Sequence, residues 1–123
     1  MHAYLGSKIA EDYKLPRSIV DIIRKHTGAG LADEDVEAMG LPPGDYMPVT
    51  LEEKIVAHAD NMVSDNRVVS HRHSVDKLMS KGAEKGALRI EVLHRELSDL
   101  FGRDLDTLIP EIGEYPKLKH VKP

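Results

Sequence analysis

The chain has 123 residues, of which 31% are charged and 4% are aromatic, with no cysteine and a formal net charge of −4. This length suits a single domain, and the negative balance and few aromatic residues argue against a nucleic-acid-binding surface. The lack of cysteine excludes disulfides, thiolate nucleophiles and cysteine-ligated zinc. We find no apolar run long enough to span a membrane and no signal peptide, so we expect a cytoplasmic protein.

Helical periodicity and helix-breaking residues divide the chain into helices joined by short loops. The helices are predicted over residues 2–13, 17–27, 33–39, 50–61, 75–85, 87–101 and 104–109. No segment has the alternation typical of a strand, and there is no internal repeat. The predicted fold class is therefore all-α, an irregular bundle of about five to seven helices. It forms one domain over residues 1–109, followed by a tail over residues 110–123.

The first two predicted helices each have an apolar face. The stripe of the helix over residues 2–13 consists of Leu5, Ile9 and Tyr13, and no N-cap precedes this helix. The inward face of the helix over residues 17–27 consists of Ile19, Val20, Ile22 and Ile23. His26 lies on the same side, and Gly28 is expected to end the helix.

The helix over residues 50–61 opens with Thr50 and Glu53 at the spacing of a capping box. Its apolar face is predicted to be Leu51, Ile55, Ala59 and Met62. Asp60 is either a metal ligand or a solvated acid, and periodicity alone favours the solvated acid. His58 and Asp60 are two residues apart, which on a helix turns them roughly 200° from each other. They cannot face one metal, so His58 is expected beside a site or at the surface.

Three further helices are predicted in the second half of the chain, over residues 75–85, 87–101 and 104–109. Residues 64–73 are polar and irregular, and we expect His71 and His73 to be a solvated pair in this loop. Ser74 is then expected to cap the helix over residues 75–85. The helix over residues 87–101 is strongly amphipathic. Its buried side is predicted to be Leu88, Val92, Leu93 and Leu97.

Histidine and aspartate are the residues with which this cysteine-free chain can bind a metal. His2, His26 and Asp60 come from three separate helices, and such side chains can converge in a bundle core around a divalent metal ion. The sequence does not show whether they converge. Motifs for a serine nucleophile, a P-loop and a dinucleotide-binding loop are missing.

Three segments together resemble one family: HAYLG (2–6), IIRKHTGAG (22–30) and LEEKIVAHADN (51–61). In order and spacing they look like the latter half of an HD-domain phosphohydrolase (HDIG-related), in an archaeal-type uncharacterised subgroup. The loop GLPPGDY (40–46) and the segment through GRD (102–104) also resemble that subgroup. Residues 1–109 would then be a partial HD-like helical domain.

The resemblance implies a helical metal-dependent phosphohydrolase that acts on nucleotides or other phosphate esters. His2 and His26 would match the two further histidines of the family pattern, and Asp60 would match its last aspartate. The divalent metal would be Mn, Fe, Ni, Zn or Mg. Arg24 and Lys25, beside His26, would help to bind phosphate, although the preferred interpretation is that they belong to a solvated helix end and interact favourably with the helix dipole.

The first histidine and the His-Asp pair of the family pattern do not occur in this chain. A metal site needs several protein ligands, so we expect these 123 residues to be an incomplete or inactive portion, either a fragment or a degenerate relative. The alternative is a non-catalytic helical module that self-associates or binds a partner protein. A homo-oligomer and a phosphate-containing small molecule are the expected partners, and nucleic acid and membrane are not.

Overall fold

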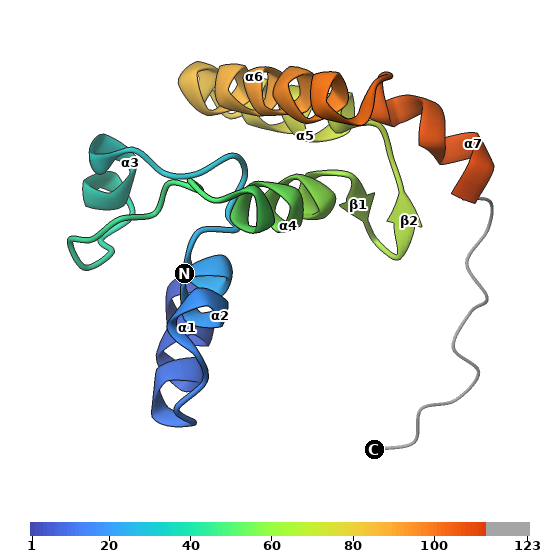
Figure 1. Cartoon of the computed structure of the whole chain (residues 1–123). Helices are drawn as coiled ribbons and strands as arrows, with labels where there is room; N and C mark the ends of the chain where they lie inside the picture. The colour runs from blue at the N-terminus through green and yellow to red at the C-terminus, as the bar shows by residue number, and fades with distance from the viewer. Residues whose placement is uncertain (113–123) are drawn as a thin grey trace.

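The structure is a computed structural model, and it describes residues 1–112. Within this range it contains seven α-helices, one 3-10 helix and a short hairpin of two antiparallel strands (Figure 1). In chain order the elements are α1 His2–Asp12, α2 Arg17–Arg24, α3 Asp33–Ala38, α4 Leu51–Asn61, β1 Val63–Ser64, β2 Arg67–Val68, α5 His71–Ser80, α6 Glu84–Phe101, η1 Leu105–Leu108 and α7 Ile109–Ile112. The mostly helical fold with seven helices confirms the predicted class, and no described helix is long and apolar enough to cross a membrane.

Two helical hairpins are joined by α4. Helix α1 packs on α2, helix α5 packs on α6, and α4 contacts α2, α5 and α6. Figure 1 shows this arrangement as an open arch, with α1 and α2 forming one limb, α4 crossing the middle and α5 and α6 lying together at the top. The predicted tail from residue 110 begins within α7, and the rest of it lies outside the described residues.

The capping box of α4 is formed as predicted. Thr50 Oγ1 accepts from the backbone N–H of Glu53 at 3.1 Å, and Glu53 Oε1 accepts from the N–H of Thr50 at 3.1 Å. These bonds satisfy amide groups that have no partner inside the helix. They fix where α4 begins and therefore which of its residues face the two hairpins.

The buried faces differ from the predicted apolar stripes. Helix α1 buries its small residues, Ala3, Ser7 and Ala10, whereas Leu5, Ile9 and Tyr13 are exposed. A Cβ on Gly6 would lie 3.1 Å from Ile23 Cγ2, which shows how closely α1 and α2 approach. Small residues permit this approach, so the large apolar side chains are left on the outer side of the hairpin.

Helices α4 and α6 depart from the prediction in the same way. The buried residues of α4 are Glu53, Ala57, His58 and Asn61, and those of α6 are Ala87, Ile90, Leu93, His94, Leu97 and Ser98. Leu51 and Ile55 on α4, and Leu88 and Val92 on α6, are exposed. The prediction that these α6 residues are buried was therefore wrong for Leu88 and Val92 and is confirmed for Leu93 and Leu97.

Residues 63–73 are not an irregular loop. Val63 pairs with Val68 and Ser64 with Arg67, across a turn in which Asp65 and Asn66 both have positive φ. Aspartate and asparagine tolerate this conformation, which two-residue hairpin turns require. Helix α5 then begins at His71 because Ser70, rather than Ser74, is the N-cap.

Candidate functional site

His2 and His26 are brought together at the open end of the α1–α2 hairpin. His2 opens α1 and His26 follows the end of α2, and their Nε2 atoms are 3.0 Å apart. Two nitrogens bound to one tetrahedral zinc-type ion at about 2.0–2.1 Å are themselves separated by roughly 3.3 Å. The spacing of these imidazoles therefore fits two ligands of one metal ion.

The contact of His26 with the backbone fixes its tautomer. Its Nδ1 lies within hydrogen-bond distance of the carbonyl oxygen of Ile23. A carbonyl can only accept, so Nδ1 carries the proton, and in the neutral ring Nε2 has the free lone pair. That lone pair faces His2, which is the orientation a metal ligand needs.

Asp60 is exposed near the end of α4. The next residue, Asn61, is buried and its Nδ2 donates to the carbonyl oxygen of Gly28 at 3.1 Å. This bond attaches the end of α4 to the loop that follows His26. Among residues 1–112, however, three possible metal ligands have their ligand atoms within 4.8 Å of one another in one group alone, and that group does not include Asp60, His2 or His26. The set His2, His26 and Asp60 stays a prediction.

Arg24 and Lys25 both have carboxylate partners. Arg24 donates to Glu11 Oε1 at 2.6 Å and to Ser7 Oγ at 3.0 Å. Lys25 is buried and its Nζ lies 3.3 Å from both carboxylate oxygens of Glu53. The expectation of a solvated helix end was therefore wrong, and a role of these two residues in binding phosphate stays a prediction.

The pair of Lys25 with Glu53 connects α2 to the first turn of α4. Burial raises the pKa of Glu53, but hydrogen bonds from the backbone N–H groups of Val49 and Thr50 and from Lys25 outweigh it and hold the pKa below its usual value. Glu53 is therefore ionised in the folded protein. This ion pair holds the segment that carries His26 against the helix that carries Asp60.

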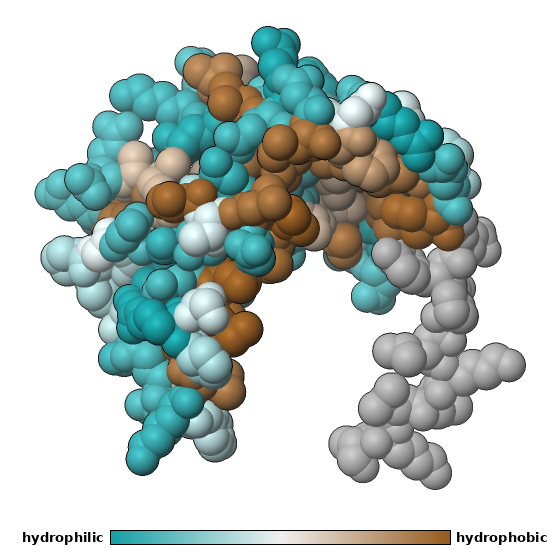
Figure 2. Space-filling view, in the orientation of Figure 1, coloured by the Kyte–Doolittle hydropathy of each residue, from teal (hydrophilic) through white to brown (hydrophobic). Residues whose placement is uncertain are grey.

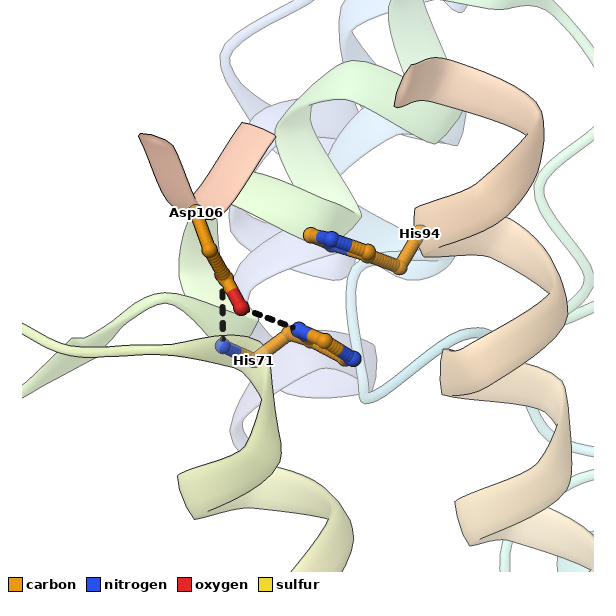
Figure 3. Close-up of side chains that lie close together, drawn as sticks. All are labelled: His71, His94 and Asp106. Atoms are coloured by element: carbon orange, nitrogen blue, oxygen red, sulfur yellow. Dashed lines mark hydrogen bonds and ion pairs between the residues drawn. The ribbon is translucent and has the colours of Figure 1, made fainter. Parts of the chain in front are cut away.

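A second group of histidines is buried between α4, α5, α6 and η1. We call His58, His71, His94, Asp104 and Asp106 the C-terminal cluster. His71 opens α5, His94 lies in the middle of α6 and Asp106 lies in η1 (Figure 3). The rings of His71 and His94 are stacked, with centroids 3.6 Å apart and an interplanar angle of 11°.

Hydrogen bonds connect the members of the C-terminal cluster. His71 Nδ1 lies 2.9 Å from Asp106 Oδ2, and Figure 3 marks this contact with a dashed line. His94 Nε2 lies 2.8 Å from Asp104 Oδ1. His94 Nδ1 also lies 2.8 Å from His58 Nε2. The Nδ1 atom of His58 is buried and has no hydrogen-bond partner among the described residues. One imidazole nitrogen of the cluster is therefore unsatisfied.

The surroundings shift the pKa of several members. Burial, and then positive charge on the neighbouring His94 and His71, lower the pKa of His58 to about 4. The hydrogen bond from His94 lowers the pKa of Asp104. Burial raises the pKa of Asp106, but bonds from Ser70 and from the backbone and ring of His71 outweigh it. At neutral pH the cluster therefore holds a neutral His58 beside two carboxylates.

An open pocket of about 420 Å³ reaches this cluster from the solvent, and His71, Glu91, His94 and Asp104 are among its lining residues. His71, His94 and Asp106 each offer a ligand atom, and these atoms all lie within 4.8 Å of one another. Within residues 1–112 this is the set of three that could hold a metal ion.

The sequence prediction missed this set. His71 was expected to be solvated but is buried, and His58, expected beside a site or at the surface, is also buried. A signal existed for His94, because Ile90, Leu93, His94 and Leu97 follow helical spacing on one face. No comparable signal joined Asp106 to α5, because that contact depends on the path of the chain after α6.

Comparison with known proteins identifies the family. The HD domain matches residues 1–65, the part of the chain that contains His2, His26 and Asp60. A tRNA (cytidine(56)-2'-O)-methyltransferase of Picrophilus torridus is 45% identical over 111 residues, which are 90% of this chain and 33% of that protein. An enzyme of the same name from Thermoplasma volcanium is 40% identical over 107 residues, which are 87% of this chain and 32% of that protein.

An uncharacterized protein of Methanocaldococcus jannaschii is 36% identical over 101 residues, which are 80% of this chain and 60% of that protein. The chain thus spans about a third of the length of the two methyltransferases. No solved structure matches the sequence. The resemblance to an archaeal-type HD protein is confirmed, and the chain belongs to the HD domain family.

Proposed function

We propose that this chain is part of an HD-type, metal-dependent phosphohydrolase that acts on nucleotides or other phosphate esters. The observation that carries the proposal is the 3.0 Å separation of His2 Nε2 and His26 Nε2 within the part that matches the HD domain. These two side chains and Asp60 would hold a divalent metal ion. The bound ion would lower the pKa of a water molecule and polarise a phosphoryl oxygen.

Hydrogen bonds and an ion pair within this chain would orient the proposed metal ligands. The carbonyl oxygen of Ile23 holds the Nδ1 proton of His26, which leaves Nε2 free to bind. Lys25 with Glu53, and Asn61 with Gly28, attach α4 to the segment around His26. The first histidine and the His-Asp pair of the family pattern are not among these residues. We therefore propose that hydrolysis needs ligands beyond the three named here.

Metal titration of the chelator-treated protein, in an Asp106→Asn background so that the C-terminal cluster does not contribute, tests the proposal. We expect Mn²⁺ or Ni²⁺ to bind, and His26→Asn and Asp60→Asn each to weaken binding more than tenfold, because each removes a ligand. His73→Asn is the matched control, since His73 is an exposed histidine on another helix. Metal affinity unchanged in His26→Asn would contradict the proposed site.

Turnover tests the second part of the proposal. The unmodified chain should hydrolyse a panel of nucleotides with added Mn²⁺ no faster than Asp60→Asn does, because the family's other ligands are missing. Hydrolysis that disappears in Asp60→Asn would show instead that the 123 residues are sufficient.

A second candidate function is self-association through an apolar surface. Leu5 and Ile9 on α1 and Tyr13 directly after it are 51%, 58% and 77% exposed, and Leu51 and Ile55 on α4 are also exposed. Figure 2 shows apolar surface along the inner side of the arch. Monomeric proteins rarely leave large apolar patches uncovered. Such a surface fits a non-catalytic helical module that binds a copy of itself.

Light scattering over a range of concentrations tests the second candidate. The protein should form a dimer or larger oligomer that Ile9→Glu dissociates, whereas Leu88→Glu on the other hairpin should not. A monomer at every concentration would contradict it.

A further inference from the structure

We propose that His71, His94 and Asp106 bind a divalent transition-metal ion of the zinc class, at a site separate from His2 and His26. The match to the HD domain ends at residue 65, so none of these three residues lies within that match. They come from three different elements, α5, α6 and η1. A bound ion would therefore connect the end of the described chain to the α5–α6 hairpin.

The ligand atoms of His71, His94 and Asp106 would bind a metal ion if the distances between them became somewhat shorter. One ring nitrogen of each histidine and one oxygen of Asp106 all lie within 4.8 Å of one another. Ligands bound to zinc at about 2.0–2.2 Å are roughly 3.3 Å apart, so each side chain has to move by about 1 Å. The stacked rings of His71 and His94 also have to rotate, because the lone pair of each ring nitrogen lies in the ring plane. His71 Nδ1 and Asp106 Oδ2 are already 2.9 Å apart.

The donor atoms select the class of ion. Two imidazoles with one carboxylate suit Zn²⁺, Co²⁺ or Ni²⁺, whereas Mg²⁺ and Ca²⁺ prefer oxygen ligands. The charges also favour a cation, because Glu91, Asp104 and Asp106 surround the two rings. Among these three carboxylates, Glu91 pairs with an arginine, Arg72.

The three proposed ligands also have the hydrogen-bond partners that hold metal ligands in place in other proteins. Metal ligands commonly donate their second ring N–H to a carboxylate, which fixes the ring. His71 Nε2 lies 3.3 Å from Glu91 Oε2, so it keeps this partner when Nδ1 binds the ion. His94 keeps either Asp104 or His58, whichever nitrogen it uses. Asp106 is itself held by Ser70 Oγ at 2.7 Å.

Two further observations support a ligand at this place. His58 is 2% exposed, contacts His94, and has a buried Nδ1 without a partner, so the cluster has an unused imidazole nitrogen. The pocket lined by His71 and His94 gives an ion a path from the solvent. Three protein ligands beside an open pocket leave one coordination position for water, as in catalytic zinc sites.

Cobalt titration tests this site, because Co²⁺ replaces Zn²⁺ and its visible absorption reports the ligands. The experiment uses the full chain with His2→Asn and His26→Asn, so that the proposed site at those two histidines does not contribute. We expect one equivalent of Co²⁺ to bind and Zn²⁺ to displace it. Glu91→Gln should weaken binding roughly 10–100-fold, and Asp106→Asn should weaken it further.

The controls separate a lost ligand from a lost fold. Asp106→Asn keeps a side chain of the same size, and circular dichroism checks its helices. Arg72→Gln removes the ion pair with Glu91 but leaves the carboxylate beside His71, so it should not weaken Co²⁺ binding. Equal Co²⁺ affinity in Asp106→Asn and its parent, or no Co²⁺ binding by the parent, would overturn the proposal. Neither result would bear on the metal titrations of His26→Asn and Asp60→Asn, so the two proposals fail independently.

Discussion

The α1–α2 hairpin and the α5–α6 hairpin each place histidines at the end or middle of a helix, but in different surroundings. His2 and His26 contact each other at the surface, and a backbone carbonyl is the further partner of His26. His71 and His94 are buried, stacked on each other and bonded to carboxylates. An exposed pair can change partners readily, whereas a buried cluster needs its partners to offset desolvation.

The apolar residues show the same contrast. Val75, Ala87, Ile90, Leu93 and Leu97 form a core cluster with Ala29, centred on the α5–α6 hairpin. In the α1–α2 hairpin, α1 buries small residues and α2 buries Val20, whereas Leu5 and Ile9 are exposed. The larger apolar core of the described residues therefore lies around α6, and a smaller one, formed by Val36, Leu41 and Tyr46, packs against Tyr4 of α1. We expect the α1–α2 hairpin to depend more on polar contacts.

Truncating one apolar residue in each hairpin is the strongest test of this contrast. Ile90→Ala should lower the free energy of unfolding by about 2–5 kcal/mol, since Ile90 is 1% exposed and its loss leaves a cavity. Ile9→Ala should change it by less than about 0.5 kcal/mol in the dilute protein, because Ile9 is exposed. Urea unfolding measures both, and equal losses would refute the contrast.

The sequence predicted which segments are helical better than it predicted their buried faces. The capping box at Thr50 and Glu53 is a local signal, and the structure contains it. The apolar stripe of Leu5 and Ile9 is exposed in the structure, because α1 approaches α2 through alanine and serine. Hydropathy does not show which side of a helix has a neighbour.

The two histidine groups were predictable to different degrees. His2 and His26 were selected through the family pattern, and the structure places them in contact. His71 and Asp106 are 35 residues apart and meet only because η1 folds back onto the start of α5. A contact of this kind depends on tertiary packing, so no local pattern in the sequence could indicate it.

The ion pair of Lys25 and Glu53 tests how the α1–α2 hairpin is attached to α4. Lys25→Met should lower the free energy of unfolding by about 3 kcal/mol, because it leaves Glu53 buried without its cation. Lys54→Met, which removes the surface pair of Lys54 with Glu96, should cost less than about 1 kcal/mol. If thermal unfolding gave the same loss for both variants, the polar attachment of this hairpin would be no stronger than a surface pair.

The pH dependence of stability tests the burial of the C-terminal cluster. The pKa of His58 is about 4 in the folded protein and 6.5 when unfolded, so the unfolded state binds more protons between these values. Stability should be unaffected by His58 above pH 6.5 and should fall by about 3 kcal/mol as the pH is lowered from 6.5 to 4.

Urea unfolding at several pH values in the presence of a chelator measures this effect. His58→Gln should remove the slope between pH 6.5 and 4.5, above the range in which carboxylates such as Glu53 begin to contribute. His73→Gln should keep the slope, since His73 is exposed. An unchanged slope in His58→Gln would mean that another group carries the pH dependence.

The smallest expected effect concerns tRNA, which appears in the names of two relatives. The cations beside His26 would be the natural contacts for phosphate, but Arg24 is paired with Glu11 and Lys25 with Glu53. Because the chain also has a formal net charge of −4, we expect no shift of tRNA in a gel at about 50–200 mM salt.

The double variant Glu11→Gln with Glu53→Gln frees both cations and is the informative comparison. Weak, salt-dependent binding that appears only in this variant would show that the carboxylates neutralise these cations. Binding by the unmodified chain would show that the α1–α2 hairpin is a nucleic-acid surface after all.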